Sequence, residues 1–307
     1  MKTAFISHPD TLLHVMDGRH PESPARISAI KDRLVADGLL KQLQLHEAPM
    51  ASDEQLARVH FPAYIKRIRD LAPPAGVVYL DPDTAMGPMT LSAVLHAAGA
   101  VALGVDLVMS GQIQNAFCCV RPPGHHAGRA RAAGFCIFNN VAVGVAHAMA
   151  KHGIQRAAII DFDVHHGDGT EDIFRNTPGV MLCSTFQHPF YPHRGADTRS
   201  DRMVNVPLPA GTDGPGFRAA VEREFAPALA EFAPQMVFVS AGFDAHRDDP
   251  LAELRLTRED FVWTTRFLMK VAQRHANGRV VSVLEGGYAL PALAESAAAH
   301  IATLANV

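Results

Sequence analysis

Short apolar runs alternate with longer amphipathic segments through the chain after Gly111. Apolar runs of this length predict buried strands, and apolar positions repeating about every three to four residues predict helices. The predicted strands are Ala116–Val120, Arg156–Asp163, Val180–Phe186, Met236–Ser240 and Val280–Leu284. The predicted helices that follow them are Asn140–Lys151, Gly169–Phe174, Pro215–Phe232, Arg258–Ala276 and Ala292–Leu304.

The part of the chain before this alternation is predicted to be mainly helical. Pro24 follows Ser23 and opens a helical pattern over Ala25–Leu40, as expected of a cap followed by proline in the first turn. Two further helical segments flank Phe61–Pro62, and a long one covers Thr90–Met109.

Strands that alternate with helices form a parallel sheet with helices on both faces. We therefore expect the α/β class, as three α/β/α layers around a mostly parallel central sheet. The chain has 307 residues, of which 48% are hydrophobic, so a large core is available. No repeat, linker or low-complexity tract interrupts it, and we expect residues 1–307 to form a single domain.

Polar residues follow the carboxyl ends of the predicted strands, which is where ligands bind in this class of fold. The richest segment is Asp161–Asp168, which contains three carboxylates and two imidazoles in eight residues. The other strand ends carry Arg121–His126, Ser184–Thr185, Ala241–Asp244 and Glu285–Tyr288. We expect these segments to meet along one rim of the sheet and to form one site.

The acidic and histidine-rich segment predicts a metal site. Alternation along a strand puts Asp161, Asp163 and His165 on one side and the apolar residues between them on the other. Ionisable groups buried together need compensation, which a bound cation provides. We predict Asp163, His165 and Asp244 as metal ligands, because three protein ligands leave a position for water or substrate. Zinc is the default, and ferrous iron or cobalt also fits these donors.

A pair of adjacent histidines and a tyrosine complete the predicted catalytic group. His125 and His126 follow two prolines and a glycine, and we predict that they exchange protons with water and the leaving amine. Asp161 and Asp168 are the carboxylates available to orient them. Tyr288 follows two glycines, and its hydroxyl is predicted to donate to the oxyanion of a tetrahedral intermediate.

Composition argues against several other classes. The formal net charge is −3 and no basic stripe occurs, so direct binding of nucleic acid is not expected. The N-terminus lacks an apolar signal core, and no uninterrupted apolar run approaches about 18 residues, so we expect a cytoplasmic protein without a membrane. Cys118, Cys119, Cys136 and Cys183 have no CxxC spacing and are expected to be free buried thiols. The sequence leaves the oligomeric state open and allows a homo-oligomer.

With these residues assembled, the chain resembles the histone deacetylase/acetylpolyamine amidohydrolase superfamily, in particular its class II-like bacterial branch. The matching segments lie at 20–26, 121–127, 134–140, 161–170, 240–251 and 284–288, in the expected order. The resemblance implies an arginase-like fold and zinc-dependent hydrolysis of an acylated amine. It implies one catalytic zinc ion on Asp163, His165 and Asp244, with His125 paired to Asp161 and His126 paired to Asp168.

The same resemblance implies a second ion and a substrate tunnel. A structural potassium ion would lie beneath the zinc, held by Asp161, Ser184 and the backbone carbonyls of Asp163, His165 and Thr185. Phe135 and Tyr191 match the aromatic pair that walls a narrow tunnel, Gly286 and Leu251 belong to the same lining, and Arg26 matches a buried arginine near its inner end. An aromatic tunnel suits an extended alkyl chain such as acyl-lysine. Leu251 stands where polyamine-selective members often carry an acidic residue, which favours acyl-lysine.

The predicted function is removal of acetyl or other acyl groups from lysine side chains or acetylated amines by metal-activated water. An acetylpolyamine amidohydrolase is the alternative within the same chemistry. A binuclear arginase-type hydrolase, with His246 and Asp248 as further ligands, and a non-catalytic module that binds acylated ligands are alternatives of other classes. Against the binuclear enzyme, the chain has no second Asp-x-His-x-Asp cluster, and the paired histidines would have no role in a two-metal mechanism.

Overall fold

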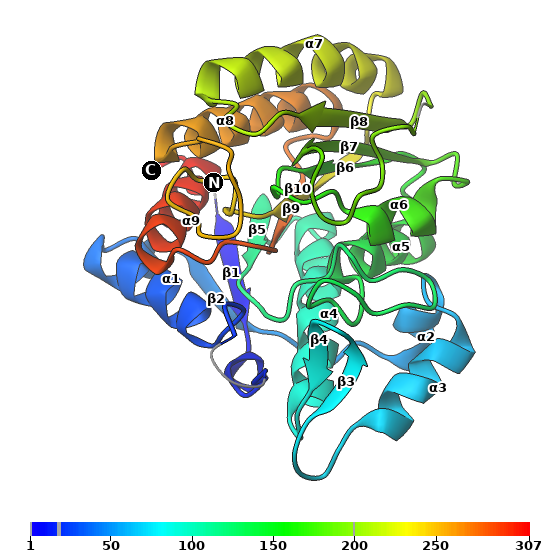
Figure 1. The fold of residues 1–307 in the computed structure, drawn as a ribbon. Helices are drawn as coiled ribbons and strands as arrows, with labels where there is room; N and C mark the ends of the chain where they lie inside the picture. Colours follow the sequence, from blue (N-terminus) through cyan, green and yellow to red (C-terminus); the bar gives the residue numbers. More distant parts are fainter. Residues whose placement is uncertain (1, 17–19, 199) are drawn as a thin grey trace.

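An eight-stranded sheet in which all neighbouring strands run parallel forms the centre of the protein (Figure 1). The computed structural model describes residues 2–16, 20–198 and 200–307. The strand order is β2-β1-β5-β10-β9-β6-β7-β8. The strands are β1 (Thr3–Ser7), β2 (Gln44–Glu47), β5 (Asn115–Cys118), β6 (Ala157–Asp161), β7 (Val180–Gln187), β8 (Met203–Leu208), β9 (Met236–Ala241) and β10 (Val280–Leu284). A separate antiparallel hairpin is formed by β3 (Val78–Asp81) and β4 (Thr84–Met86).

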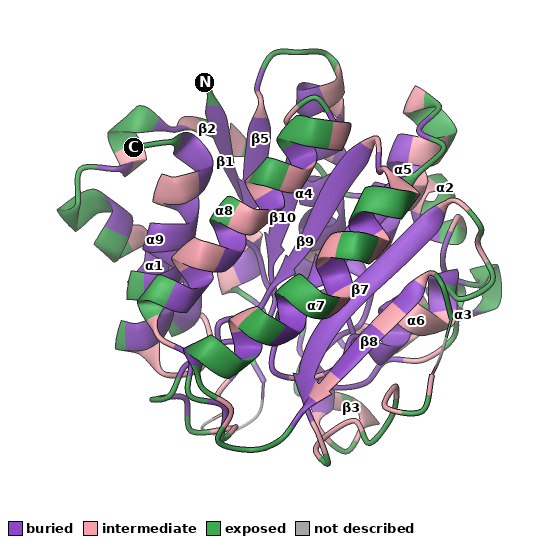
Figure 2. Ribbon diagram, turned by 90° about the horizontal axis from the view of Figure 1, so that it is seen from above, coloured by how far each residue is buried: buried purple, intermediate pink, exposed green. Residues whose placement is uncertain are grey.

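Helices cover both faces of the sheet, which confirms the predicted three layers (Figure 1). One face packs against α2 (Asp53–Ala57), α3 (Pro62–Leu71), α4 (Thr90–Met109), α5 (Asn140–His152) and α6 (Asp168–Phe174). The other face packs against α1 (Ala25–Ala36), α7 (Gly214–Phe232), α8 (Arg258–His275) and α9 (Leu290–Ala305). Figure 2 shows the sheet buried between helices whose outer sides are exposed.

The five predicted strands are all present and lie next to one another as β5-β10-β9-β6-β7. Five strands are missing from the prediction: β3 and β4 of the hairpin, and β2, β1 and β8, which lie outside this block at the two ends of the sheet. In β2, partly buried residues alternate with exposed ones, and β8 contains Pro207. Strands near a sheet edge tolerate both features, so they lack the continuous apolar run of a central strand.

The predicted helices are also present, with shifts of one or a few residues at their ends. The largest correction concerns Ala25–Leu40, because α1 ends at Ala36. Gly38 then adopts a φ of 67°, a left-handed conformation that ends a helix, and a short 3₁₀ turn follows at Leu40–Gln42.

Two predicted boundaries change the description of the site. The strand predicted over Arg156–Asp163 ends at Asp161, so Asp163 and His165 lie in the following loop. Phe162 and Val164 still pack into the apolar layer of α8 and α9, and the predicted separation of faces persists beyond the strand. Ser184 and Thr185 were expected at a strand end, but β7 continues to Gln187.

Helix α4 is long and apolar enough to cross a membrane by length and composition alone. In the fold, 78% of its most apolar window is buried, against β1, β5, β10 and α5. It therefore has the surroundings of a core helix.

Candidate active site

Loops from the carboxyl ends of β5, β6, β9 and β10 enclose a cavity of about 210 Å³. Eight of the predicted site residues line it, and Asp83, Pro123, Gly134 and Phe190 contribute further surface. The full lining is Asp83, Pro123, His125, His126, Gly134, Phe135, His165, Phe190, Tyr191, Leu251, Gly286 and Tyr288.

The loop after β6 is folded around its own carboxylates. The backbone N–H of Asp163 donates to Oδ1 of Asp161 at 3.1 Å, and that of His165 donates to Oδ1 of Asp163 at 2.9 Å. The N–H of Val164 donates to Oδ1 of Asp244 at 2.9 Å, which ties the loop to the end of β9. Short polar side chains that accept from nearby amides in this way hold a loop in one conformation.

Asp163, His165 and Asp244 form the group with the chemistry of a metal site. One ligand atom from each lies within 4.8 Å of the other two. Nδ1 of His165 lies 3.0 Å from Oδ1 of Asp163 and 3.2 Å from Oδ2 of Asp244. Oδ2 of Asp244 is nevertheless buried without a hydrogen bond of acceptable geometry. A buried carboxylate oxygen without a donor is costly, and a cation at this point removes that cost.

The ionisation of the three groups reflects their crowding. Burial and the charge of Asp163 raise the pKa of Asp244 to about 7. Burial alone would lower the pKa of His165, but the carboxylates of Asp163 and Asp244 beside it raise it to about 10. Both raised pKa values mean that added positive charge is favoured between the two carboxylates. This is the electrostatic condition for binding a divalent cation.

Two glycines leave the room that this group needs. A Cβ at Gly286 would overlap Oδ2 of Asp244 and lie 2.6 Å from Oδ2 of Asp163. A Cβ at Gly242 would overlap the carboxylate of Asp163. The N–H of Gly286 also donates to Oδ2 of Asp163 at 2.8 Å. The donor set and this cradle fit a zinc or iron ion bound by two carboxylates and one imidazole.

His125 and His126 each pair with the predicted carboxylate. Nδ1 of His125 lies 2.9 Å from Asp161, and Nδ1 of His126 lies 2.9 Å from Asp168. A carboxylate only accepts, so Nδ1 of each ring carries the proton and donates it. Nε2 of each ring is then the atom available for proton transfer.

The two rings have opposite pKa shifts although they lie 4.1 Å apart. Burial alone would lower the pKa of His125, but the charges of Asp161, Asp163 and Glu285 raise it well above its usual value. Burial and the neighbouring charge of His125 lower the pKa of His126 to about 4, against the opposing effect of Asp168. Two neighbouring groups whose pKa values are shifted in opposite directions can act one as the acid and the other as the base.

Tyr288 reaches the same cavity from the loop after β10. Its ring meets Phe135 edge to face at 6.0 Å, and the guanidinium of Arg26 lies 5.0 Å from its centroid. Burial raises the pKa of Tyr288 well above its usual value despite Arg26, so the phenol stays protonated and able to donate. Arg26 is buried, as its match near the inner end of the tunnel implied, and it also donates to the backbone carbonyl of Gly287 at 2.7 Å.

The residues expected to form the tunnel line the cavity together. Tyr191 packs edge to face on His126 at 5.1 Å, and Phe190 stacks on His165 at 5.6 Å. Leu251, Gly286 and Phe135 complete the lining.

The residues expected to hold a second ion are also neighbours. Asp161 of β6 is paired in register with Ser184 of β7, and both side chains are fully buried. Nδ1 of His166 lies 3.0 Å from Oγ of Ser184. Thr185 follows in the same strand and is buried as well.

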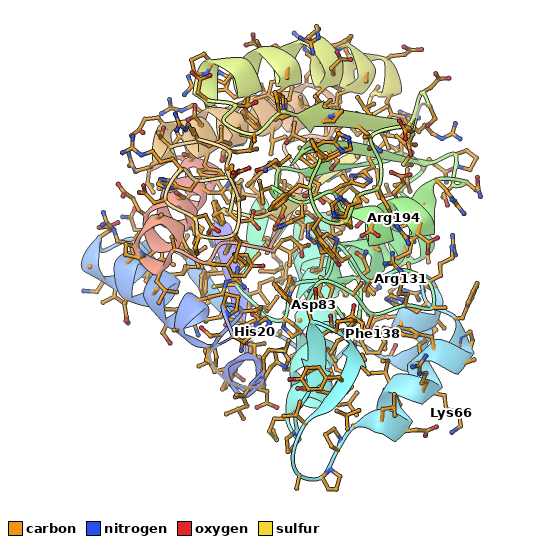
Figure 3. All side chains as sticks on the ribbon, viewed as in Figure 1. His20, Lys66, Asp83, Arg131, Phe138 and Arg194 are labelled. Carbon is orange, nitrogen blue, oxygen red and sulfur yellow. The ribbon has the colours of Figure 1, made fainter. Side chains whose placement is uncertain are left out.

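Several residues around the site had no role assigned from the sequence, although Glu285 belonged to a predicted strand-end segment. Glu285 accepts from the amides of Gly124 and His125 at 2.7 and 3.2 Å and so holds the histidine turn. Arg131 and Arg194, both labelled in Figure 3, approach Oδ2 of Asp168 at 2.7 and 3.7 Å. Glu285 adjoins the two glycines before Tyr288, so its place in a strand-end motif was a usable signal. The arginines lie in irregular loops that carry no pattern.

His246 and Asp248, the further ligands that a binuclear site would need, do not join the metal group. Asp248 is largely exposed, and its carboxylate lies 3.7 Å from Nδ1 of His246. The part of the chain that the structure describes places Asp163, His165 and Asp244 together without a fourth such side chain in the group.

Two other groups of ligand type occur among the described residues, Asp106 with His147 and His152, and Asp10 with His8 and His96. Arg58 donates to Nδ1 of His147, so Nδ1 accepts and Nε2 of the same ring donates to Asp106 at 2.8 Å. A hydrogen bond therefore explains that contact. In the second group, the rings of His8 and His96 stack 3.5 Å apart at 6°, and one ion cannot lie in the plane of both.

Comparisons with known proteins agree on one family. The family model described as "Histone deacetylase domain" matches residues 20–304. A histone deacetylase-like amidohydrolase of Pseudomonas aeruginosa is 41% identical over 88% of this chain and 72% of that protein. The polyamine deacetylase HDAC10 of Homo sapiens is 37% identical over 99% of this chain, which spans about half of that protein. A crystal structure of the HDA15 HD domain superposes with a TM-score of 0.90 at 32% identity, covering 99% of this chain and 90% of that one.

Proposed function

Because this chain belongs to the histone deacetylase family, we propose that it removes acyl groups from lysine side chains by zinc-dependent hydrolysis of the amide. Hydrolysis of acylated amines is the chemistry of the family. The observation that carries the zinc site is the buried Oδ2 of Asp244, which has no hydrogen bond and faces Asp163 and His165. One ion per chain, held by these three side chains, would polarise the substrate carbonyl and lower the pKa of a bound water.

The protein groups around this site have distinct proposed roles. His126, which burial keeps neutral, presents Nε2 as the base that takes a proton from the attacking water. His125, held protonated by Asp161, delivers a proton to the leaving amine. Asp168 keeps the ring of His126 in the tautomer that this transfer needs.

Stabilisation of the oxyanion is assigned to Tyr288. The phenol is partly buried and protonated, and it lines the cavity between Phe135 and Arg26. A donor of this kind, fixed before the reaction, stabilises charge that develops in the transition state. Phe135, Tyr191, Gly286 and Leu251 would enclose the alkyl chain of the substrate and exclude water.

A small acylated polyamine is the second candidate substrate. Asp83 lines the cavity near Tyr191, and a carboxylate there is placed to attract a second ammonium group on the substrate. Leu251 offers no such charge at the tunnel wall, which supports acyl-lysine. The relatives include proteins named polyamine deacetylases, so both substrates need to be compared.

We also propose a structural potassium ion, a single domain and a cytoplasmic location. Buried Asp161 and Ser184, adjacent across β6 and β7, support the potassium site, together with the carbonyls of Asp163, His165 and Thr185. Parallel pairing across all eight strands supports one domain over residues 1–307. Four free buried cysteines are typical of a reducing compartment.

The test is a substrate panel on one preparation of the zinc-loaded protein. Acetyl-lysine peptides, longer acyl-lysines and acetylputrescine are compared by kcat/KM, and bound metal is counted by mass spectrometry. We expect about one zinc ion per chain and the highest kcat/KM with an acyl-lysine peptide. A higher kcat/KM with acetylputrescine would instead identify an acetylpolyamine amidohydrolase. Two transition-metal ions per chain would contradict the mononuclear site.

A further inference from the structure

The segment that carries Tyr288 is held almost residue by residue. The N–H of Glu285 donates to the carbonyl of Ala241 at 3.0 Å, and the carbonyl of Gly286 accepts from Phe243 at 3.0 Å. These bonds fix the segment as far as Gly286. Gly287 has a φ of 123°, a conformation that side chains rarely adopt, and its carbonyl accepts from Nε of Arg26 at 2.7 Å.

Asp249 supplies the next fixed points. Its Oδ2 accepts from the amides of Tyr288 and Ala289 at 2.7 and 3.2 Å. Its Oδ1 accepts from the amide of Leu251 at 3.0 Å. The side chain comes from the loop after β9 and is only 6% exposed, so water does not readily replace it.

The position of Asp249 also explains how α9 begins. This helix begins at Leu290 after Ala289, which has no side chain able to cap it. The carboxylate of Asp249 lies at that end and accepts from the Ala289 amide. A negative charge is favoured at a helix N-terminus, where backbone amides lack partners.

We propose that Asp249 is a positioning residue, which fixes the Tyr288 phenol relative to the tunnel wall at Leu251. This proposal rests on the function proposed above. The two carboxylate oxygens join the backbone of Tyr288 to the backbone of Leu251, and both of these residues line the cavity. Asp249 itself is absent from the lining and acts through the residues that it holds.

Loss of this carboxylate has a definite consequence. The Asp249→Asn side chain keeps one oxygen, but its amide group brings a donor toward the N–H of either Tyr288 or Leu251. One of the two loops then loses its anchor, and the phenol hydroxyl moves away from the position where it donates. A misplacement of about 1 Å at a reacting group can cost about 100-fold in rate.

An experiment that does not depend on activity uses 3-fluorotyrosine and fluorine NMR. The chain has four tyrosines, so four signals are expected, and a Tyr288→Phe variant identifies the signal of Tyr288. We expect Asp249→Asn to shift, broaden or split that signal while leaving the signals of Tyr64 and Tyr79 in place. Asp248→Asn is the matched control, since it removes the same charge from the adjacent, largely exposed position. Asp249→Ser, which also retains one oxygen, is measured if Asp249→Asn does not fold.

A double-mutant cycle gives the kinetic readout. Asp249→Asn alone should lower kcat by about 10- to 100-fold with little change in KM. In the Tyr288→Phe background the same substitution should change kcat by less than about threefold, because the hydroxyl that it positions is already missing. Asp248→Asn should leave kcat unchanged in both backgrounds.

Equal losses of kcat in the two backgrounds, or an unchanged Tyr288 signal in Asp249→Asn, would overturn the positioning role. If the zinc-loaded protein hydrolyses no member of the substrate panel, the proposed function fails instead. The fluorine signal still decides between a fixed and a displaced Tyr288 in that case.

Discussion

The rings of His125 and His126 are in contact at 4.1 Å, yet each donates Nδ1–H to a different carboxylate. The two aspartates come from opposite ends of one loop, Asp161 at the end of β6 and Asp168 at the start of α6. This loop therefore orients both histidines, and it also carries two of the proposed metal ligands. The segment Asp161–Asp168 thus supplies both carboxylates that orient the histidines and two of the three proposed metal ligands.

Replacing either histidine should mainly reduce turnover. We expect His125→Ala and His126→Ala each to lower kcat by about 10²- to 10⁴-fold, the range for a lost general acid or base. Steady-state kinetics with an acetyl-lysine peptide measures this, with Asp248→Asn as a variant outside the site. A loss of less than about tenfold for either variant would remove that histidine from the proton-transfer scheme.

The Tyr288 hydroxyl should matter in the transition state more than in substrate binding. Tyr288→Phe keeps the ring against Phe135 and Arg26 and removes one donor, so kcat should fall by about 100-fold or more. KM and the calorimetric affinity for a non-hydrolysed substrate analogue should change little. Full activity in this variant would leave oxyanion stabilisation to other groups.

Gly286, which packs against two of the proposed ligands, gives a test of the metal site that keeps all three ligand residues. In Gly286→Ala the new Cβ overlaps the carboxylate of Asp244 and crowds that of Asp163, so the ligands must separate. We expect zinc affinity, measured by competition with a chelator, to fall by at least about tenfold, as for loss of other groups supporting a metal site. Gly87→Ala, whose Cβ comes no nearer than 3.4 Å to any neighbour, is the control. Equal affinities in the two variants would argue against an ion at this point.

Much of this site could be predicted because its residues follow buried central strands. Asp161, Asp244 and Glu285 each come at or just after a strand whose apolar run is unbroken, and parallel strands bring such ends to one edge. The outer strands could not be predicted on this basis. β1 has only three apolar residues of five, and β2 and β8 carry polar or proline positions.

Contacts between loops were the second feature that could not be predicted from the sequence. In the sequence, Asp249 is one acidic residue in a turn. Its proposed role depends on hydrogen bonds from the amides of Tyr288 and Ala289, which are 39 and 40 residues away in the chain. Arg131 similarly pairs with Asp168 across 37 residues without any periodic pattern. Such partners are set by the packing of irregular loops, which local sequence patterns do not encode.

Buried histidines outside the site should make the fold sensitive to acid. Burial lowers the pKa of His300 to about 3, from 6.5 when unfolded, and its ring is enclosed by Thr265 and Ser282. Between these pH values the unfolded chain binds one more proton at this residue than the folded chain. Its contribution to stability is thus present above pH 6.5 and is lost as pH falls toward 3, at about 1.4 kcal/mol per pH unit.

His14 and His60, each with a pKa lowered to about 4 mainly by burial, act in the same direction. Urea unfolding of the protein at several pH values between 4 and 6.5 measures the combined slope. In His300→Gln the slope should be smaller by about one proton, whatever the variant's absolute stability. The exposed His193, replaced by Asn, provides the control, and an unaltered slope in His300→Gln would contradict the assignment.

The carboxylate of Asp83 at the cavity gives a test that separates the two candidate substrate classes. Asp83 lines the cavity, and its Oδ1 accepts from the hydroxyl of Thr84 at 3.0 Å, a bond that Asp83→Asn can retain. The variant therefore removes charge with little change of shape. If the second ammonium of a polyamine binds here, KM for acetylputrescine should rise about 3- to 10-fold, the size expected for a partly exposed ion pair of about 1 kcal/mol. KM for a neutral acetyl-lysine peptide should stay within about twofold. Equal changes for both substrates would mean that Asp83 shapes the entrance without selecting cationic amines.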